Sequence, residues 1–406
     1  MQIGEVASFQ NGYAFKSKDF VQDGKYKIIK IKELKDGKVR FFNDSASVNV
    51  DDERIIEKYI AEKGDVLFAL TGDPVNKNNP LSWVGRVSVY EDDQLALLNQ
   101  RVCKLVPKEG LNAKYIYYYF RAFDNFYALA SIAKGSASQA NISTKDIEAM
   151  EIALPSLNIQ NKIVSVLDSI AEKINQNNKI NKNLEQQAQA IFKSWFIDFH
   201  PFGGNRPIDW VTGIVDDLGA EIICGKTPST KRKEYYGGNT PFITIPDMHG
   251  CVYNVSTERY LSAAGVASQP KKTLPPNTVC VSCIGTAGLV TLVSEKSQSN
   301  QQINAIVPKE GISVYYIYLL MQTLSETINK LGQSGSTIVN LNKTQFAKIP
   351  VTIPSEQVLC NFDTLCKPLF EMILSNQKEN IRLTNLRDTL LPKLMSGELD
   401  VSDIDI

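Results

Sequence analysis

The chain has 406 residues, of which 43% are hydrophobic and 22% charged, a composition typical of a soluble globular protein with two or three domains. Basic and acidic residues both number 44, so no overall positive charge points to nucleic acid, and any DNA contact must come from a local cluster. The seven cysteines are irregularly spaced, and no signal peptide or membrane-length apolar run occurs, which predicts a cytoplasmic protein without a membrane anchor.

An internal repeat organises the chain. The segment NQRVCKLVPKEGLNAKYIYYYF at 99–120 recurs as NQQINAIVPKEGISVYYIYLLM at 300–321, with ten of the 22 aligned positions identical. Flanking segments recur in the same order with a period of about 200 residues, which is too long for a solenoid repeat and predicts a duplicated domain. In each half, short β-branched and aromatic runs predict strands. A Tyr-rich helix, a Gly/Ser loop and a long polar helix follow them.

The elements therefore follow one another in a repeated order. We predict a globular domain at 1–156, a long helix at 157–199, a linker at 200–213, a second globular domain at 214–355, and a second long helix with a tail at 356–406. The fold class is α+β, with two pseudo-symmetric α/β domains joined by two long helices that form an antiparallel coiled coil.

The two long helices carry heptad seams. From Ile163 and from Phe362, apolar residues recur at alternating spacings of four and three, although an amphipathic helix packed on its own domain is an alternative. Paired asparagines, which can set register, interrupt both seams at matching places, at Asn177, Asn181, Asn376 and Asn380. The seam fits either direction, because parallel pairing would also align the asparagines. A two-fold axis relating the duplicated halves favours antiparallel pairing, with Asn177 opposite Asn380 and Asn181 opposite Asn376.

The segment AEIICGKTPS at 220–229 ends like a phosphate-binding loop. Its first position is Ala220 rather than glycine, and no apolar helix pattern follows the Lys-Thr. Aligned with the first half, Gly225-Lys226-Thr227 falls on Gly12-Tyr13-Ala14, so only the glycine is shared. This predicts a turn glycine rather than a nucleotide site.

Neither metal binding nor catalysis is predicted. His249, Cys251, Cys280 and Cys283 could supply four zinc ligands, but the last two lie in an apolar run typical of a buried strand. The Asn/Asp-Pro-Pro-aromatic motif of an adenine methyltransferase is missing, since NPLSW from Asn79 lacks the second proline. The two histidines have no Ser or Cys partner visible in the sequence. The chain is therefore expected not to be an enzyme.

Several phrases, taken in order, resemble the specificity (S) subunits of type I restriction-modification systems over essentially the whole chain. They are GDVLFALTG at 64–72, AIFKSWFIDFHPF at 190–202, CGKTPSTKRKEYYGGNTPF at 224–242 and LRDTLLPKLMSGELDV at 386–401. The resemblance implies two target recognition domains, each reading one half of a split double-stranded DNA site. It also implies helices that act as a spacer and dock methyltransferase (modification) subunits, two being expected.

The resemblance further implies that restriction/translocase subunits join through the complex. It places S-adenosylmethionine, ATP and Mg²⁺ on the partner subunits, with no cofactor and no metal in this chain. A protein-only coiled-coil scaffold with two sensory domains is the alternative, and the balanced net charge favours it slightly.

DNA contact would then come from polar and basic loops. In the second half the candidates are Lys226, Thr227, Ser229, Thr230, Lys231, Arg232 and Lys233. In the first half they are Lys16, Ser17, Lys18, Asn76, Lys77, Asn78 and Asn79. The Gly/Ser loops add Lys134, Ser136, Ser138, Gln139 and Asn141, and Gln333, Ser334 and Ser336. The alternatives are a solvated charged turn for 226–233 and flexible tethers for the Gly/Ser loops.

Overall fold

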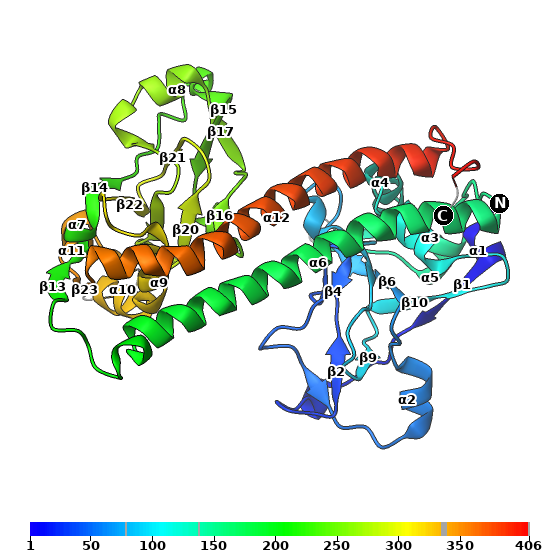
Figure 1. The fold of residues 1–406 in the computed structure, drawn as a ribbon. Helices are drawn as coiled ribbons and strands as arrows, with labels where there is room; N and C mark the ends of the chain where they lie inside the picture. The colour runs from blue at the N-terminus through cyan, green and yellow to red at the C-terminus, as the bar shows by residue number, and fades with distance from the viewer. Residues whose placement is uncertain (78, 137–138, 334–338, 405–406) are drawn as a thin grey trace. The chain divides into compact units, whose positions relative to one another are not determined.

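The computed structural model describes residues 1–77, 79–136, 139–333 and 339–404 (Figure 1). The chain forms two compact units. Unit 1 comprises Met1–Glu172 with Asn385–Ile406, and unit 2 comprises Lys173–Thr384. The division runs through both long helices, α6 (Leu157–Phe196) and α12 (Glu356–Ser396). Each unit therefore contains one globular domain and part of each helix, whereas the sequence assigns each helix to a segment of its own.

Unit 1 is built on a six-stranded sheet with the order β1-β10-β6-β8-β4-β3. Its strands are β1 (Ala7–Asn11), β3 (Leu34–Lys35), β4 (Lys38–Val39), β6 (Val66–Ala69), β8 (Val87–Val89) and β10 (Val102–Pro107). Two three-stranded sheets complete the unit: β5-β2-β9, from β2 (Tyr26–Ile29), β5 (Ser47–Val48) and β9 (Ala96–Leu98), and β11-β12-β7, from β7 (Thr71–Gly72), β11 (Lys134–Ser136) and β12 (Gln139–Asn141). Its shorter helices are α1 (Ile3–Val6), α2 (Glu53–Tyr59), α3 (Ala113–Tyr119), α4 (Phe123–Ser131) and α5 (Thr144–Glu148).

Unit 2 is built on a five-stranded sheet with the order β14-β22-β19-β20-β16. Its strands are β14 (Gly219–Cys224), β16 (Tyr253–Asn254), β19 (Val279–Ser282), β20 (Val290–Val293) and β22 (Ile303–Pro308). A four-stranded sheet, β17-β15-β21-β18, joins β15 (Tyr236–Ile243), β17 (Arg259–Leu261), β18 (Thr273–Leu274) and β21 (Ser297–Ser299), and β13 (Val211–Ile214) pairs with β23 (Pro350–Ile353). Its shorter helices are α7 (Val215–Leu218), α8 (Ala263–Ala267), α9 (Val314–Thr323), α10 (Ser325–Gly332) and α11 (Lys343–Ala347).

The two units confirm the duplication. The order β1-β10-β6-β8 in unit 1 matches β14-β22-β19-β20 in unit 2, and the parallel pair β2–β9 matches the parallel pair β15–β21. The central strands β6 and β19 are buried at all four positions, as their apolar runs require. In Figure 1, β2 and α2 lie on the side of unit 1 away from α3 and α5. In unit 2, β15, β17 and α8 likewise lie on the side away from α9.

The long helices pair antiparallel, as predicted. In unit 2, Phe192 near the end of α6 has its ring 6.4 Å from that of Phe362 near the start of α12. In unit 1, Leu167 near the start of α6 shares a core with Leu391 near the end of α12. The same helix residues also pack on the globular domains, so the coiled-coil and the domain-packing interpretations both hold. Within the described ranges, no helix is long and apolar enough to cross a membrane.

The glycines that the repeat shares at 12 and 225 are required by close packing, not by a left-handed turn. Neither has a positive φ. A Cβ on Gly12 would overlap the backbone carbonyl of Asn99, and one on Gly225 would overlap that of Asn300. The amide of Gly12 donates to Val102 O at 2.9 Å, and that of Gly225 to Ile303 O at 3.1 Å. The expected turn glycine is therefore a position where two backbones meet without space for a side chain.

We expect Gly225→Ala to destabilise unit 2 by more than about 3 kcal/mol, because a backbone overlap cannot be relieved by rotating a side chain. Gly237→Ala is the matched control. Its φ of +80° makes alanine strained, but nothing lies within 4 Å of the added Cβ, so a cost of about 1–2 kcal/mol is expected. Hydrogen exchange at the amides of β14 and β22 measures the difference. Equal protection in the two variants would contradict it.

Candidate nucleic-acid interface

The densest basic segment, 226–233, connects β14 to β15 in unit 2. Its backbone is held at two points near its start. The amide of Lys226 donates to Ser299 O at 2.8 Å, and Tyr236 Oη donates to Pro228 O at 2.8 Å. Thr227 is half-buried and its Oγ1 donates to Gln301 Oε1 at 2.7 Å. The remaining candidates are exposed, namely Lys226, Ser229, Thr230, Lys231, Arg232 and Lys233. Fixed backbone with exposed side chains fits a contact surface better than a loose solvated turn does.

The positive charges of this segment are available to a ligand. Within the part of the chain that the structure describes, Lys226, Lys231 and Lys233 form no ion pair. Arg232 lies against Tyr235, with its guanidinium carbon 5.4 Å from the ring centre and Nη1 donating to the hydroxyl at 3.0 Å. That contact orients the guanidinium without neutralising it.

The matching segment of unit 1 carries fewer charges. Lys16, Ser17 and Lys18 lie in and before the short helix η1 (Ser17–Asp19) and are all exposed. The amide of Tyr13 donates to Leu98 O at 2.8 Å, the bond that Lys226 makes to Ser299 in unit 2. The duplicated fold therefore presents a polar segment at the same point of each unit.

The β7–β8 loop of unit 1 is held by its own side chains. Trp83 Nε1 donates to Lys77 O at 2.7 Å, and Asn79 Oδ1 caps the short helix η2 (Pro80–Ser82) by accepting from the amide of Leu81 at 3.2 Å. Asn76, Lys77 and Asn79 are exposed, while Asn78 lies outside the described residues. Lys77 Nζ is 2.9 Å from Asp73 Oδ1, so part of its charge is already compensated.

The first Gly/Ser segment is not the loop that its composition predicts. Lys134–Ser136 and Gln139–Asn141 form the antiparallel hairpin β11–β12, and β12 pairs with β7. Asn141 Oδ1 accepts from Thr71 Oγ1 at 2.8 Å, and Lys134 Nζ lies 3.1 Å from Asp146 Oδ1. Pairing with a distant strand has overridden the weak strand propensity of this segment. Ser138 lies outside the described residues.

The structure brings two of the three unit 1 candidate segments together. The hairpin and the β7–β8 loop share the sheet β11-β12-β7. The third segment, 16–18, is followed by Val21, which bridges to Ser47 of β5 in a different sheet. In unit 2, Gln333 is exposed at the end of α10, and Asn340 beyond it bridges to Ile284 after β19 rather than to the β15 sheet. Ser334 and Ser336 lie outside the described residues.

The asparagines of the long helices form a polar layer in unit 2. Asn177 is only 1% exposed, and its Nδ2 donates to Asn380 Oδ1 at 2.9 Å and to Glu379 Oε2 at 2.8 Å. Asn376 Nδ2 donates to Asn181 Oδ1 at 2.8 Å. The hydrogen bond from Asn177 lowers the pKa of Glu379. This is the pairing expected for antiparallel helices.

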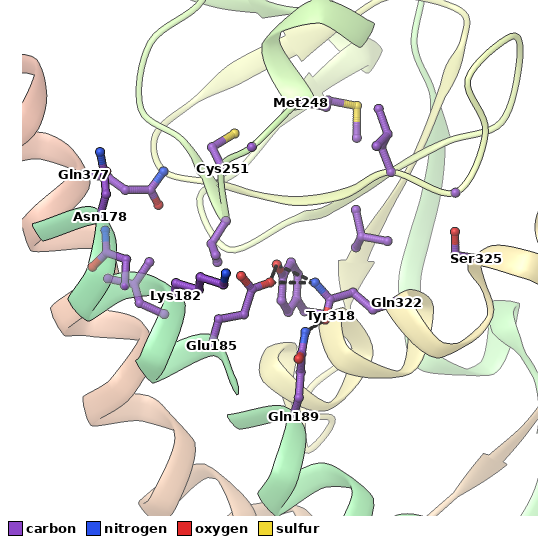
Figure 2. A pocket seen from close by; sticks show the side chains of 17 residues that line it. Asn178, Lys182, Glu185, Gln189, Met248, Cys251, Tyr318, Gln322, Ser325 and Gln377 are labelled. Carbon is purple, nitrogen blue, oxygen red and sulfur yellow. Dashed lines mark hydrogen bonds between the residues drawn. The ribbon is translucent and has the colours of Figure 1, made fainter. Parts of the chain in front are cut away.

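Sequence reasoning missed a cavity in each unit. In unit 2, a cavity of about 660 Å³ lies between α6, α9 and the turn before β16 (Figure 2). Its polar centre is Glu185, whose Oε1 accepts from Tyr318 Oη at 3.0 Å and from Gln322 Nε2 at 2.9 Å. Burial, followed by the charge of Glu185, raises the pKa of Tyr318 well above its usual value.

In unit 1, a cavity of about 310 Å³ has a lining that includes Lys35, Arg86 and Arg121 together with the carboxylate of Asp36. The three basic residues are far apart in the sequence, so no local motif identifies this cavity. Extending the repeat alignment by one position pairs Arg121 with Gln322, so the repeat relates one lining residue of each cavity but does not mark the cavities themselves.

Comparison with known proteins identifies the family to which this chain is similar. The family model described as "Type I restriction modification DNA specificity domain" matches residues 1–186 and 207–360. The chain is 34% identical over 342 residues to the type I restriction enzyme HindI specificity subunit of Haemophilus influenzae, covering 68% of this chain and 74% of that protein. It is 26% identical over 322 residues to the MjaIX specificity subunit of Methanocaldococcus jannaschii, covering 75% and 73%.

A solved structure shares the fold. The type I restriction-modification S subunit from M. genitalium superposes with a TM-score of 0.62 at 17% identity, covering 99% of this chain and 96% of that one. The comparisons give no support to a protein-only scaffold. The chain therefore belongs to the family of type I restriction-modification DNA specificity subunits, and it is a DNA-recognising rather than a catalytic component of such a system.

Proposed function

We propose that each unit reads one half of a bipartite double-stranded DNA target. The observation that carries this proposal is the duplication, since the two units have the same sheet order and present a polar segment at the same point. Two similar readers on one chain suit a target made of two separate half-sites.

The segments divide into two proposed roles. Lys226, Lys231, Arg232 and Lys233 grip phosphates, because exposed cations on a fixed backbone supply affinity without reading sequence. In unit 1, the exposed amides of Asn76 and Gln139 are suited to base edges, since an amide can donate and accept on one adenine. Lys16 and Lys18 play the phosphate role there.

We further propose that the helices dock two methyltransferase subunits and set the spacing between half-sites. The observation that supports this is the antiparallel pairing of α6 and α12, in which Asn177 lies opposite Asn380 and Asn376 opposite Asn181. Restriction/translocase subunits join through the complex, and S-adenosylmethionine, ATP and Mg²⁺ belong to the partners. The seven free cysteines suit assembly in a reducing cytoplasm.

The phosphate role predicts a change in salt dependence. Replacing Lys231, Arg232 and Lys233 together with alanine should weaken DNA binding at least about tenfold and reduce the log–log salt slope by about 0.9 for each lost phosphate contact. Binding is measured on the target duplex as a function of salt, with the methyltransferase subunits present.

The matched control removes the same charge from Lys309, Lys343 and Lys348. These exposed lysines lie near the start of β14 and the end of β22, at the opposite end of these strands from the basic segment. Their replacement should leave the slope unchanged. A slope that responds equally in both variants, or in neither, would place segment 226–233 away from DNA.

A further inference from the structure

The cavities of the two units are counterparts. In unit 1 the walls are the β3–β4 turn, the start of β8 and the end of α3, and in unit 2 they are the turn before β16, the start of β20 and α9. The strand pairs β4–β8 and β16–β20 are both parallel, and Gly85 and Gly288 before β8 and β20 have φ of +82° and +85°. The repeat alignment pairs Tyr117 with Tyr318 and Arg121 with Gln322.

An anion already occupies this position in unit 2. The carboxylate of Glu185 projects from α6 and receives the hydroxyl of Tyr318 and the amide of Gln322, as Figure 2 shows. Gln322 also accepts from Gln189 Nε2 at 3.2 Å. The fold thus holds a negatively charged oxygen between the tyrosine and the residue four positions after it.

In unit 1 no carboxylate is hydrogen-bonded to either of these positions within the described residues, although Asp36 lines the cavity and Glu91 and Asp168 lie near enough to Tyr117 to help burial raise its pKa. A Cβ built on Gly37 would lie 2.7 Å from Tyr117 Oη and 2.8 Å from Arg121 Nη1, so both polar groups converge on the β3–β4 turn. Among the described residues, neither side chain has an acceptor or carboxylate partner. The second long helix carries Thr384 at the position that matches Glu185. The donors are retained, but no carboxylate bridges them among the described residues as Glu185 does in unit 2.

The rest of the unit 1 cavity is more basic than its counterpart. Arg86 stands where unit 2 has Leu289, and Lys35 stands where it has His249. Arg86 donates to Leu81 O and, from Nη2 at 3.2 Å, to Ile31 O. Its Nε–H is buried and has no acceptor within the described part of the chain. Burial lowers the pKa of Arg86, and the nearby carboxylates of Asp73 and Asp36 offset part of that effect without forming an ion pair with it in the described part of the chain.

We propose that this cavity of unit 1, the Arg121 cavity, binds a phosphate group at the place where unit 2 holds the Glu185 carboxylate. Arg121, Arg86 and Lys35 supply positive charge that outweighs the one carboxylate of the lining, Asp36. Tyr117, whose hydroxyl reaches Gly37 of the β3–β4 turn, supplies a donor. Guanidinium groups suit phosphate because they present parallel donors. The rim includes Pro80 and Leu81, from the loop that carries Asn76 and Lys77. The phosphate therefore belongs to the DNA backbone or to a free nucleotide, and the DNA source rests on the proposed function.

The test uses the full chain with its methyltransferase subunits. Arg121→Gln installs the residue of unit 2, and Arg54→Gln is the control, since Arg54 is exposed on unit 1 and pairs with Asp52 at 3.1 Å. With a DNA phosphate bound, Arg121→Gln should lower affinity about tenfold for target and unrelated duplexes alike and reduce the salt slope by about 0.9. Arg54→Gln should change neither.

A second arm identifies the source of the phosphate. Inorganic phosphate and adenosine monophosphate are titrated into the wild-type and Arg121→Gln complexes by calorimetry. Binding by the wild type alone, with an unchanged DNA salt slope, supports the cavity as a site for free phosphate. An unchanged slope with no titration difference overturns the proposal. It is also overturned if Arg121→Gln weakens only assembly with the methyltransferase subunits, because the anion is then a protein carboxylate.

Two further comparisons keep these outcomes distinct. Thermal unfolding checks that Arg121→Gln is folded, and Lys35→Gln, at the exposed end of β3, repeats the measurement if it is not. The variant lacking the charges of 231–233 is assayed beside it. If the wild type shows no salt-dependent DNA binding, the proposed function fails. If only Arg121→Gln and Lys35→Gln lack the expected effects, the phosphate site alone is wrong.

Discussion

Exchanging the first globular domain for that of another specificity subunit is expected to change one half of the recognised sequence and leave the other half intact. The reason is that each unit has its own sheets, core and candidate contact segments. Each mismatched base pair costs about 1–3 kcal/mol, so two changed positions should weaken binding to the original target about 30-fold or more. Methylation mapping of a genome that carries the hybrid measures both halves at once.

The structure determines how this exchange should be made. Residues 1–150 can be replaced as a block, but their core includes Leu167 of α6 and Leu391 and Leu394 of α12. The donor domain must therefore keep residues that pack on these helix positions. A reciprocal hybrid that receives residues 214–355 is the control, and it should change the opposite half. If either hybrid altered both halves, or neither half, the two units would not be independent readers.

Lengthening both long helices by one heptad is expected to lengthen the unread spacer between the half-sites by about 3 base pairs. Seven residues add about 10 Å of helix, and base pairs are about 3.4 Å apart. The insertions belong after Glu172 in α6 and after Thr384 in α12, which lie at the same level because Asn177 is opposite Asn380. These points coincide with the division between the units, so every contact within each unit is kept.

The measurement is a comparison across targets with different spacers. Three added base pairs also rotate one half-site by about 100° around the DNA axis, which can lower the methylation rate on every target. The informative quantity is therefore the methylation rate on one spacer length relative to another in the same variant. Four-residue insertions at the same points shift the heptad seam and should cost stability instead. If the heptad variant methylates only the original spacing at full rate, the helices do not set the distance.

Local patterns in the sequence determined the architecture. The repeated NQ–VPKEG segment predicted two similar domains, because a duplicated sequence preserves the apolar positions that select strand order. The glycines of VPKEG, Gly110 and Gly311, both adopt left-handed φ, as a turn requires. The heptad seams predicted two long paired helices because a helical period is written in neighbouring residues.

Tertiary structure alone decided the rest. The direction of the helix pair stayed open in the sequence because the asparagines align either way, and the hydrogen bond between Asn177 and Asn380 settles it as antiparallel. The hairpin β11–β12 exists because β7, about 70 residues earlier, supplies the edge on which it pairs. Arg86 and Arg121 face one cavity although 35 residues separate them. Such convergence depends on non-local pairing of strands and packing of helices, which no local period records.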